Sequence, residues 1–94
     1  MRYGYRQNKG TVSLEGEVNV AVAAELKGIL VRALDDQRAG ETVVNLSEVE
    51  RLDVSAVQQL LAFKRDCLAE GRRFETIGAS EQVQNRLAQM GISL

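Results

Sequence analysis

The sequence contains no histidine and only one cysteine, Cys67. Without histidine, the usual zinc, iron and copper sites lack a common ligand, and the commonest general base and phosphorelay acceptor near neutral pH is missing. A lone cysteine cannot form an internal disulfide. No nucleophile elbow or cofactor motif offsets these absences. We therefore expect neither a disulfide scaffold nor a metal site, no cofactor, and no enzymatic activity.

The chain also lacks a strong charge of either sign and a long apolar stretch. Its net charge is -1 and its longest purely basic run is Arg72–Arg73, so no positive field collects nucleic acid. No segment approaches the ~20 apolar residues that cross a bilayer, and Met1–Arg6 has no signal-peptide h-region. We therefore expect a cytoplasmic protein without a nucleic-acid partner or membrane insertion.

The residues that are present have the composition of an ordinary globular domain, with 45% hydrophobic and 27% charged residues. A chain of this length buries only about two-thirds of its unfolded surface, which is enough for one core but not for two. No repeat or linker interrupts it. We expect one domain over residues 1–94, in which residues 1–10 form an N-terminal strand and turn.

The first half of the chain predicts a β-hairpin followed by a helix. Alternating patterns indicate strands over Tyr3–Gln7 and Thr11–Glu15, joined by turn residues 8–10. Asn19 is a good N-cap, and the apolar residues after it recur at steps of three and four. This spacing predicts an amphipathic helix that ends near Gly40, which suits a left-handed stop.

The second half predicts a strand, a connector and a second helix. Thr42–Leu46 is short and β-branched, which is typical of a strand buried on both faces, and residues 47–52 have the character of a connector. Helical spacing returns over 55–70, where Gly71 can end the helix. A helix that leads into a buried strand implies parallel pairing.

The chain then predicts one more strand, Phe74–Ile77, and a last helix capped by Ser80. The inner face of that helix carries Val83, Leu87 and Met90. The resulting order, β-β-α-β-α-β-α, is that of an α/β domain with helices packed on a mixed sheet.

The strand-turn-helix segment 45–56 contains the strongest functional candidate, Ser55. A serine at the start of a helix lies near free backbone N–H groups and the positive end of the helix dipole, so a phosphate on Ser55 is electrostatically favourable. The same serine, with Gln58 three residues later, also fits a capping box. That role is worth about 1 kcal/mol of helix stability and needs no regulation. The residues alone leave both interpretations open.

Several segments, taken in order, resemble one known family. They are Leu14–Asn19, Asn45–Val49, Leu52–Val57 and Gly71–Gly78 with Met90–Ile92. The STAS domains of bacterial anti-sigma factor antagonists carry similar segments: Leu-x-Gly-x-Leu-Asp, then Asp-Leu-Ser-x-Val-x-x-Ile-Asp-Ser-Ser-Gly-Leu, then Gly-x-x-Leu-x-Leu-x-Gly and Gly-Leu. The resemblance extends from about Thr11 to Ile92.

This resemblance implies a STAS-like fold, a mixed sheet of about four strands with three or so helices mainly on one face. It implies a protein partner, an ATP-dependent serine kinase that is also an anti-sigma factor. Phosphorylation of Ser55 would add about -1.5 to -2 charges at the interface and disrupt the complex. The partner-binding residues that it implies are Asn19, Asn45, Asp53, Val54, Ser55, Ala56 and Gln59.

Four positions depart from the family pattern. Asn19 and Asn45 replace acidic residues, while Val54 and Ala56 replace the first serine and the glycine of the Asp-Ser-Ser-Gly turn; Asp53 is retained. Asparagine keeps the shape and hydrogen bonding of aspartate but loses its charge. The departures favour an alternative, an unphosphorylated STAS subunit of a chemotaxis-type signalling complex or of a lipid-transport ABC complex.

The remaining polar candidates are better explained by structure than by chemistry. Cys67 lies on an apolar helix face, where an unreactive buried thiol is expected. The carboxylate pairs Asp35–Asp36 and Glu15/Glu17 fit solvated charges. Arg72 and Arg73 follow a helix end, where they suit the helix dipole and the solvated surface.

Overall fold

The computed structural model describes residues 1–6, 9–36 and 40–94. The elements, in order, are β1 (Arg2–Arg6), β2 (Thr11–Val18), the 3-10 turn η1 (Val20–Val22), α1 (Ala23–Asp35), β3 (Glu41–Leu52), α2 (Val54–Ala69), β4 (Arg73–Ile77) and α3 (Glu81–Gln89). This order confirms the predicted hairpin and the alternation that follows it. Residues 7 and 8 of the predicted hairpin lie outside the described residues.

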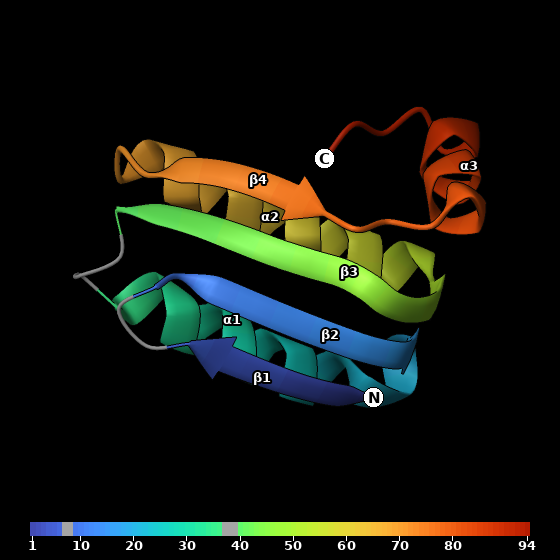
Figure 1. Cartoon of the computed structure of the whole chain (residues 1–94), viewed down its shortest axis with the longest axis horizontal. Helices are drawn as coiled ribbons and strands as arrows, with labels where there is room; N and C mark the ends of the chain where they lie inside the picture. Colours follow the sequence, from blue (N-terminus) through green and yellow to red (C-terminus); the bar gives the residue numbers. More distant parts are fainter. Residues whose placement is uncertain (7–8, 37–39) are drawn as a thin grey trace.

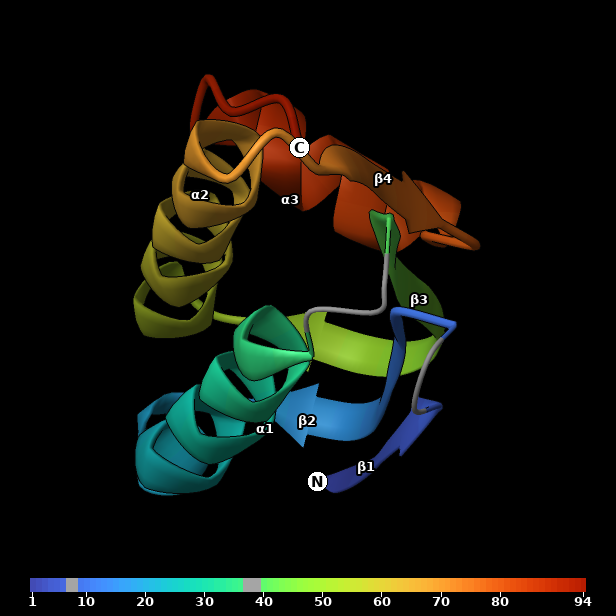
Figure 2. The same ribbon diagram turned by 90° about the vertical axis from the view of Figure 1, so that its left-hand side faces the viewer.

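The four strands form one mixed sheet in the order β1-β2-β3-β4. β1 pairs antiparallel with β2, whereas β2, β3 and β4 pair in parallel, as crossover helices require. α1 and α2 lie side by side against one face of the sheet, and α3 lies beyond the end of β4 (Figures 1 and 2). The predicted STAS-like α/β architecture is therefore confirmed.

β3 is longer than the sequence pattern predicts, and the connector predicted over residues 47–52 is part of this strand. The pairing between β2 and β3 shifts register twice, at Ser13/Glu15 and at Gly16/Glu17. Such irregularities break strict alternation, because an extra residue changes which side chains face the core. Leu46, Val49 and Leu52 consequently all point inward at a spacing of three.

The prediction that the central strand is buried on both faces is also wrong. Thr42 and Val44 are fully buried against the helices, but Val43 and Asn45, which alternate with them, are only half-buried on the other face. The core therefore lies between the sheet and the helix layer. Its buried apolar residues are Val12, Leu14, Val18, Leu26, Ile29, Leu30, Ala33, Val44, Leu46, Val49, Leu52, Ala56, Val57, Leu60, Phe63, Cys67, Val83 and Leu87.

Asn19 caps the 3-10 turn that precedes α1, since its Oδ1 accepts a hydrogen bond from the Ala21 N–H at 2.9 Å. α1 itself ends at Asp35, before the predicted end. Gly40 does not adopt the left-handed conformation expected of a helix stop. The chain leaves the helical conformation at Asp36, whose backbone is extended, and an arginine from elsewhere in the chain binds the carbonyls of the last turn.

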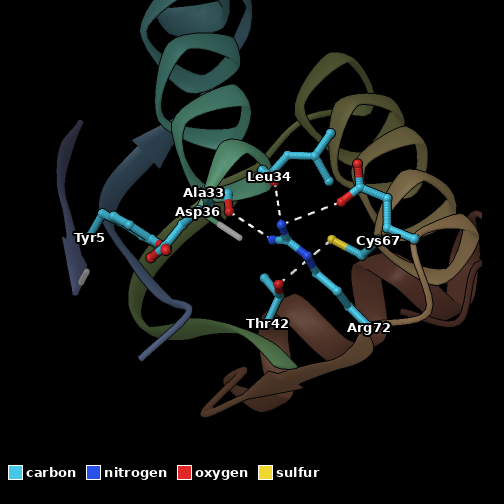
Figure 3. A network of polar contacts seen from close by, with 8 residues as sticks. Tyr5, Ala33, Leu34, Asp36, Thr42, Cys67 and Arg72 are labelled. Atoms are coloured by element: carbon cyan, nitrogen blue, oxygen red, sulfur yellow. Dashed lines mark hydrogen bonds and ion pairs between the residues drawn. The ribbon is translucent and has the colours of Figure 1, made fainter. Parts of the chain in front are cut away.

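That arginine is Arg72, which is almost completely buried. Its guanidinium donates hydrogen bonds to the carbonyl oxygens of Ala33, at 2.9 Å, and of Leu34, and forms an ion pair with Glu70 at 3.3 Å (Figure 3). The positive charge satisfies the last carbonyls of α1 and its negative dipole end. The predicted dipole role is correct in kind, but Arg72 serves α1 rather than the helix that it follows.

Two further contacts surround this cluster. The Cys67 thiol donates a long hydrogen bond to Thr42 Oγ1 at 3.7 Å, and the Tyr5 hydroxyl donates to the Asp36 carboxylate (Figure 3). Burial raises the pKa of the Cys67 thiol, so little reactive thiolate forms. Cys67 is fully buried, as expected for a structural cysteine. Burial and the bond to Asp36 raise the pKa of Tyr5 to about 12.

Gly78, between β4 and α3, tests whether close packing against β3 fixes the chain at this point. It has φ +75°, and a Cβ at this position would lie 2.7 Å from the Cβ of Ser47 in β3. Gly71 has the same φ, but a Cβ there would meet nothing within 4 Å. We expect Gly71→Ala to cost roughly 1 kcal/mol of unfolding free energy through backbone strain alone. Gly78→Ala should cost about 2–3 kcal/mol, because the clash with β3 adds to the strain.

Urea unfolding of both variants, followed by far-UV circular dichroism, measures this difference. Gly4→Ala is a neutral reference, since Gly4 has neither a left-handed φ nor a close neighbour. Equal losses for the two variants would show that the contact with Ser47 does not fix the chain at this point.

Candidate functional site

The start of α2 is joined to the start of the η1–α1 segment by Asp53. Its Oδ1 accepts a hydrogen bond from the Ala56 N–H at 2.9 Å, which caps α2, and its Oδ2 accepts from the Val20 N–H at 2.9 Å. The Asp53 N–H in turn donates to the Val18 carbonyl oxygen at 3.1 Å. One short side chain thus connects segments 33 residues apart in the sequence.

The capping role predicted for Ser55 is wrong, because Asp53 is the N-cap of α2 and the helix begins at Val54. An aspartate satisfies the orphan N–H groups with a full negative charge at the positive end of the helix dipole. Ser55 is therefore the second helical residue. Its side chain is half-buried and makes no hydrogen bond with the described residues. The hydroxyl is not needed for capping.

Gln59 indicates the direction in which Ser55 faces. Its Nε2 donates a hydrogen bond to the Ala23 carbonyl oxygen at 3.1 Å, so this face of α2 is turned toward the start of α1. Residues four apart on a helix share a face, and Ser55 precedes Gln59 by four. Ser55 accordingly lies on the side of α2 that faces the start of α1. Gln59, a predicted partner-binding residue, is half-buried and makes this intramolecular hydrogen bond.

Two exposed valines flank Asp53. Val20 is 71% exposed at the start of η1, and Val54 is 50% exposed at the start of α2. Ala56 is buried and belongs to the core, so it is not available to a partner. We call Val20, Asp53, Val54 and Ser55 the docking corner. Exposed apolar side chains beside a polar group are typical of protein interaction sites.

The sequence did not identify Val20 as part of this site. Its position after Asn19 suggested only the start of a helix, and the hydrogen bond from its N–H to Asp53 is what brings it to the start of α2. No pattern within the sequence relates these two valines.

Asn19 and Asn45, the two asparagines that replace family acids, lie in different places. Asn19 is half-buried beside the docking corner. Asn45 lies mid-strand in β3, among the residues of the uncovered sheet face, and its Oδ1 accepts a hydrogen bond from the Ser47 N–H at 2.9 Å. It precedes Asp53 by a distance on the order of 20 Å along the strand. The structure therefore separates Asn45 from the other predicted site residues.

A groove of about 600 Å³ adjoins the docking corner, where the ends of β2 and β3 meet α3. It shares Asn19 and Asp53 with that region. The charged residues of its lining have both signs: Glu17, Glu50, Asp53, Arg51 and Arg86. Such a rim suits polar contacts at the edge of a protein interface.

Within the part of the chain that the structure describes, no three His, Cys, Asp or Glu residues are grouped so that they could hold a metal ion. The helices of that same part include none with both the length and the apolar character needed to cross a bilayer.

Asp53 gives a test of the docking corner. Asp53→Ala removes the acceptors of two N–H groups, and we expect it to lower the free energy of unfolding by about 2–4 kcal/mol. Asp53→Asn keeps one acceptor oxygen and should lose roughly half as much. Urea denaturation measures both losses, and amide hydrogen exchange should be faster at Val20 and Ala56. Unchanged exchange at Val20 in Asp53→Ala would contradict the bridging role.

Comparisons with known proteins agree with this architecture. Solved structures with the same fold include the anti-sigma factor antagonist SpoIIAA of Bacillus in its unphosphorylated form, at 15% identity and a TM-score of 0.72 over 93% of this chain and 80% of that chain. Its phosphorylated form matches at 15% identity and 0.72, over 96% and 82%. A putative anti-sigma factor antagonist from Thermotoga maritima matches at 19% identity and 0.75, over 96% and 77%.

No curated protein sequence matches the chain. The family model described as "Mlab, STAS domain" matches residues 1–93. With nearly the whole chain covered by that model, this protein belongs to the STAS domain family.

Proposed function

We propose that this domain is a regulatory protein-binding module of the anti-sigma factor antagonist type. Its partner is an ATP-dependent serine kinase that also acts as an anti-sigma factor, and the domain binds it through the docking corner. The observation that carries the proposal is the position of Ser55, a half-buried hydroxyl with no intramolecular hydrogen bond among the described residues, next to exposed Val54.

The apolar part of the corner provides affinity. Val20 and Val54 both project into solvent, and Asp53 holds their two segments together, so the partner meets a preformed surface. A preformed surface binds with little loss of conformational entropy. The charged rim of the adjoining groove supplies polar contacts that fix orientation.

Phosphorylation of Ser55 ends the interaction. In that reaction Ser55 Oγ attacks the γ-phosphorus of ATP, a Ser–O–P bond forms, the bond to the β-phosphate oxygen breaks, ADP leaves, and the hydroxyl proton passes to a base on the kinase. The product carries about -1.5 to -2 charges beside Val54 and two residues from Asp53. The dipole of α2 stabilises this phosphate within the free domain, whereas an apolar interface excludes it.

The matches to SpoIIAA support a local switch. That protein has both a phosphorylated and an unphosphorylated form, and this chain aligns equally well with each, with a TM-score of 0.72 in both cases. We infer that a phosphate here acts on charge and desolvation at the surface and leaves the fold in place.

The second candidate is an unphosphorylated STAS subunit of a chemotaxis-type signalling complex or a lipid-transport ABC complex. Two observations favour it. Asn19 brings no charge to the docking corner, and Asn45 lies far from Ser55 on the uncovered face of the sheet. In this reading the same corner binds constitutively, and Ser55 is only a surface serine.

The two candidates predict different results when the domain is incubated with a serine kinase of the anti-sigma factor type. We expect incubation with the kinase and ATP to add one phosphate, located at Ser55 by mass spectrometry. Ser55→Ala should block the addition, while Ser13→Ala, a change on the uncovered sheet face, should not. Ser55→Asp should weaken binding to the kinase about tenfold or more, because it places a charge at the interface.

Phosphate uptake by Ser55→Ala would contradict the assignment of the site. Normal binding of the Ser55→Asp variant to its partner would favour the constitutive subunit. Val54→Asp tests the docking surface in both cases, since it introduces a charge without changing Ser55.

A further inference from the structure

The solvent-facing side of α1 has a short uncharged strip that is bordered by charged residues. A surface helix normally presents charged and polar residues opposite its buried face. α1 buries Leu26, Ile29, Leu30 and Ala33. At 100° per residue, the opposite side is centred on Ala24, Gly28 and Val31, which are all exposed, Val31 by 47%, and it ends at the exposed Asp35 in the last turn. In Figure 2, no labelled element lies on the side of α1 that is turned away from the sheet and from α2.

Gly28 destabilises α1, and the fold of the single chain does not require a glycine at this position. Glycine in a helix interior destabilises it relative to alanine. The φ of Gly28 is not left-handed, and a Cβ at this position would meet no atom within 4 Å. An alanine would therefore fit the isolated domain. Close approach by another backbone is a contact for which the absence of a side chain matters.

The charges that border this face are self-complementary. Glu25 and Arg32 are both exposed, lie on the same flank of the face, and have no ion-pair partner among the described residues. They are also placed symmetrically about the point midway between Gly28 and Ile29, because each lies three and a half residues from it. A two-fold axis through that point brings opposite charges together.

We propose that this face of α1 binds a second copy of the chain, with the two α1 helices antiparallel about that axis. In an isologous pair the same flanks meet, so Glu25 faces Arg32 of the partner subunit, and the contact occurs twice. Asp35 is unfavourable at the C-terminal end of its own helix, and it is brought beside the N-terminal end of the partner's α1, where a negative charge is favourable. Lys27, on the other flank, extends into solvent.

The proposal is independent of phosphorylation at Ser55 and can be tested without any other protein. Sedimentation equilibrium of the full chain at micromolar to millimolar concentrations should give a mass that rises from 10.4 kDa toward twice that value. Glu25→Arg and Arg32→Glu should each weaken self-association about tenfold or more, because each turns both ion pairs into repulsive pairs.

The decisive sample is an equimolar mixture of these two variants. Within a mixed pair, the arginines of one chain face the glutamates of the other, so association should return to the wild-type level. The double variant Glu25→Arg with Arg32→Glu should also associate normally. Glu48→Arg and Arg65→Glu are matched controls at exposed positions outside α1, and they should leave the mass unchanged.

Gly28→Ala distinguishes a role of Gly28 in self-association from a role in the stability of the monomer. It should raise the melting temperature of the dilute monomer and at the same time weaken self-association, whereas a purely structural glycine would change stability alone. A wild-type chain that stays at 10.4 kDa at every concentration would overturn the proposal. The proposal would also be overturned if the α1 variants self-associated normally but bound a different protein more weakly, because this face would then belong to a heterologous partner.

Discussion

The hydrogen bonds of Asp53 hold together the only part of the described chain where the starts of two helices meet beside exposed valines. β2 and β3 run parallel, so their carboxyl ends emerge at the same edge of the sheet, and the helices that follow both begin there. Two helix starts bring unpaired N–H groups and two positive dipole ends to one place. The two oxygens of the Asp53 carboxylate accept one N–H from each of these segments. Val20 and Val54 are exposed on either side of this contact.

The same arrangement explains how one hydroxyl could control binding. Because Asp53 caps α2, Ser55 has no structural task and remains available at the surface. Modification of a residue that does not hold the fold can change the interface without unfolding the domain. Asn19 nearby is neutral, so the proposed phosphate on Ser55 would share this region with the carboxylate of Asp53.

At the opposite end of the helix layer, where α1 ends, the positive charge of Arg72 has the corresponding role. Arg72 neutralises the last carbonyls of α1 and joins that helix to the chain entering β4. A carboxylate at one end and a guanidinium at the other thus complement the dipole of each helix terminus that they meet. Between these two ends, α1 presents an outer side whose middle is the exposed, uncharged strip of Ala24, Gly28 and Val31.

The sequence by itself determined the order of the elements, the parallel pairing and the family, because hydrophobic periodicity, glycine stops and cap residues act over a few neighbours. The Ser80 cap, the left-handed Gly71 and the buried Cys67 all follow from local pattern. Tertiary structure decided the rest. The register shifts within β3, the binding of the last α1 carbonyls by Arg72, and the hydrogen bond from the Val20 N–H to Asp53 each depend on a partner distant in the sequence. Such contacts leave no periodic signal, so only the folded chain reveals them.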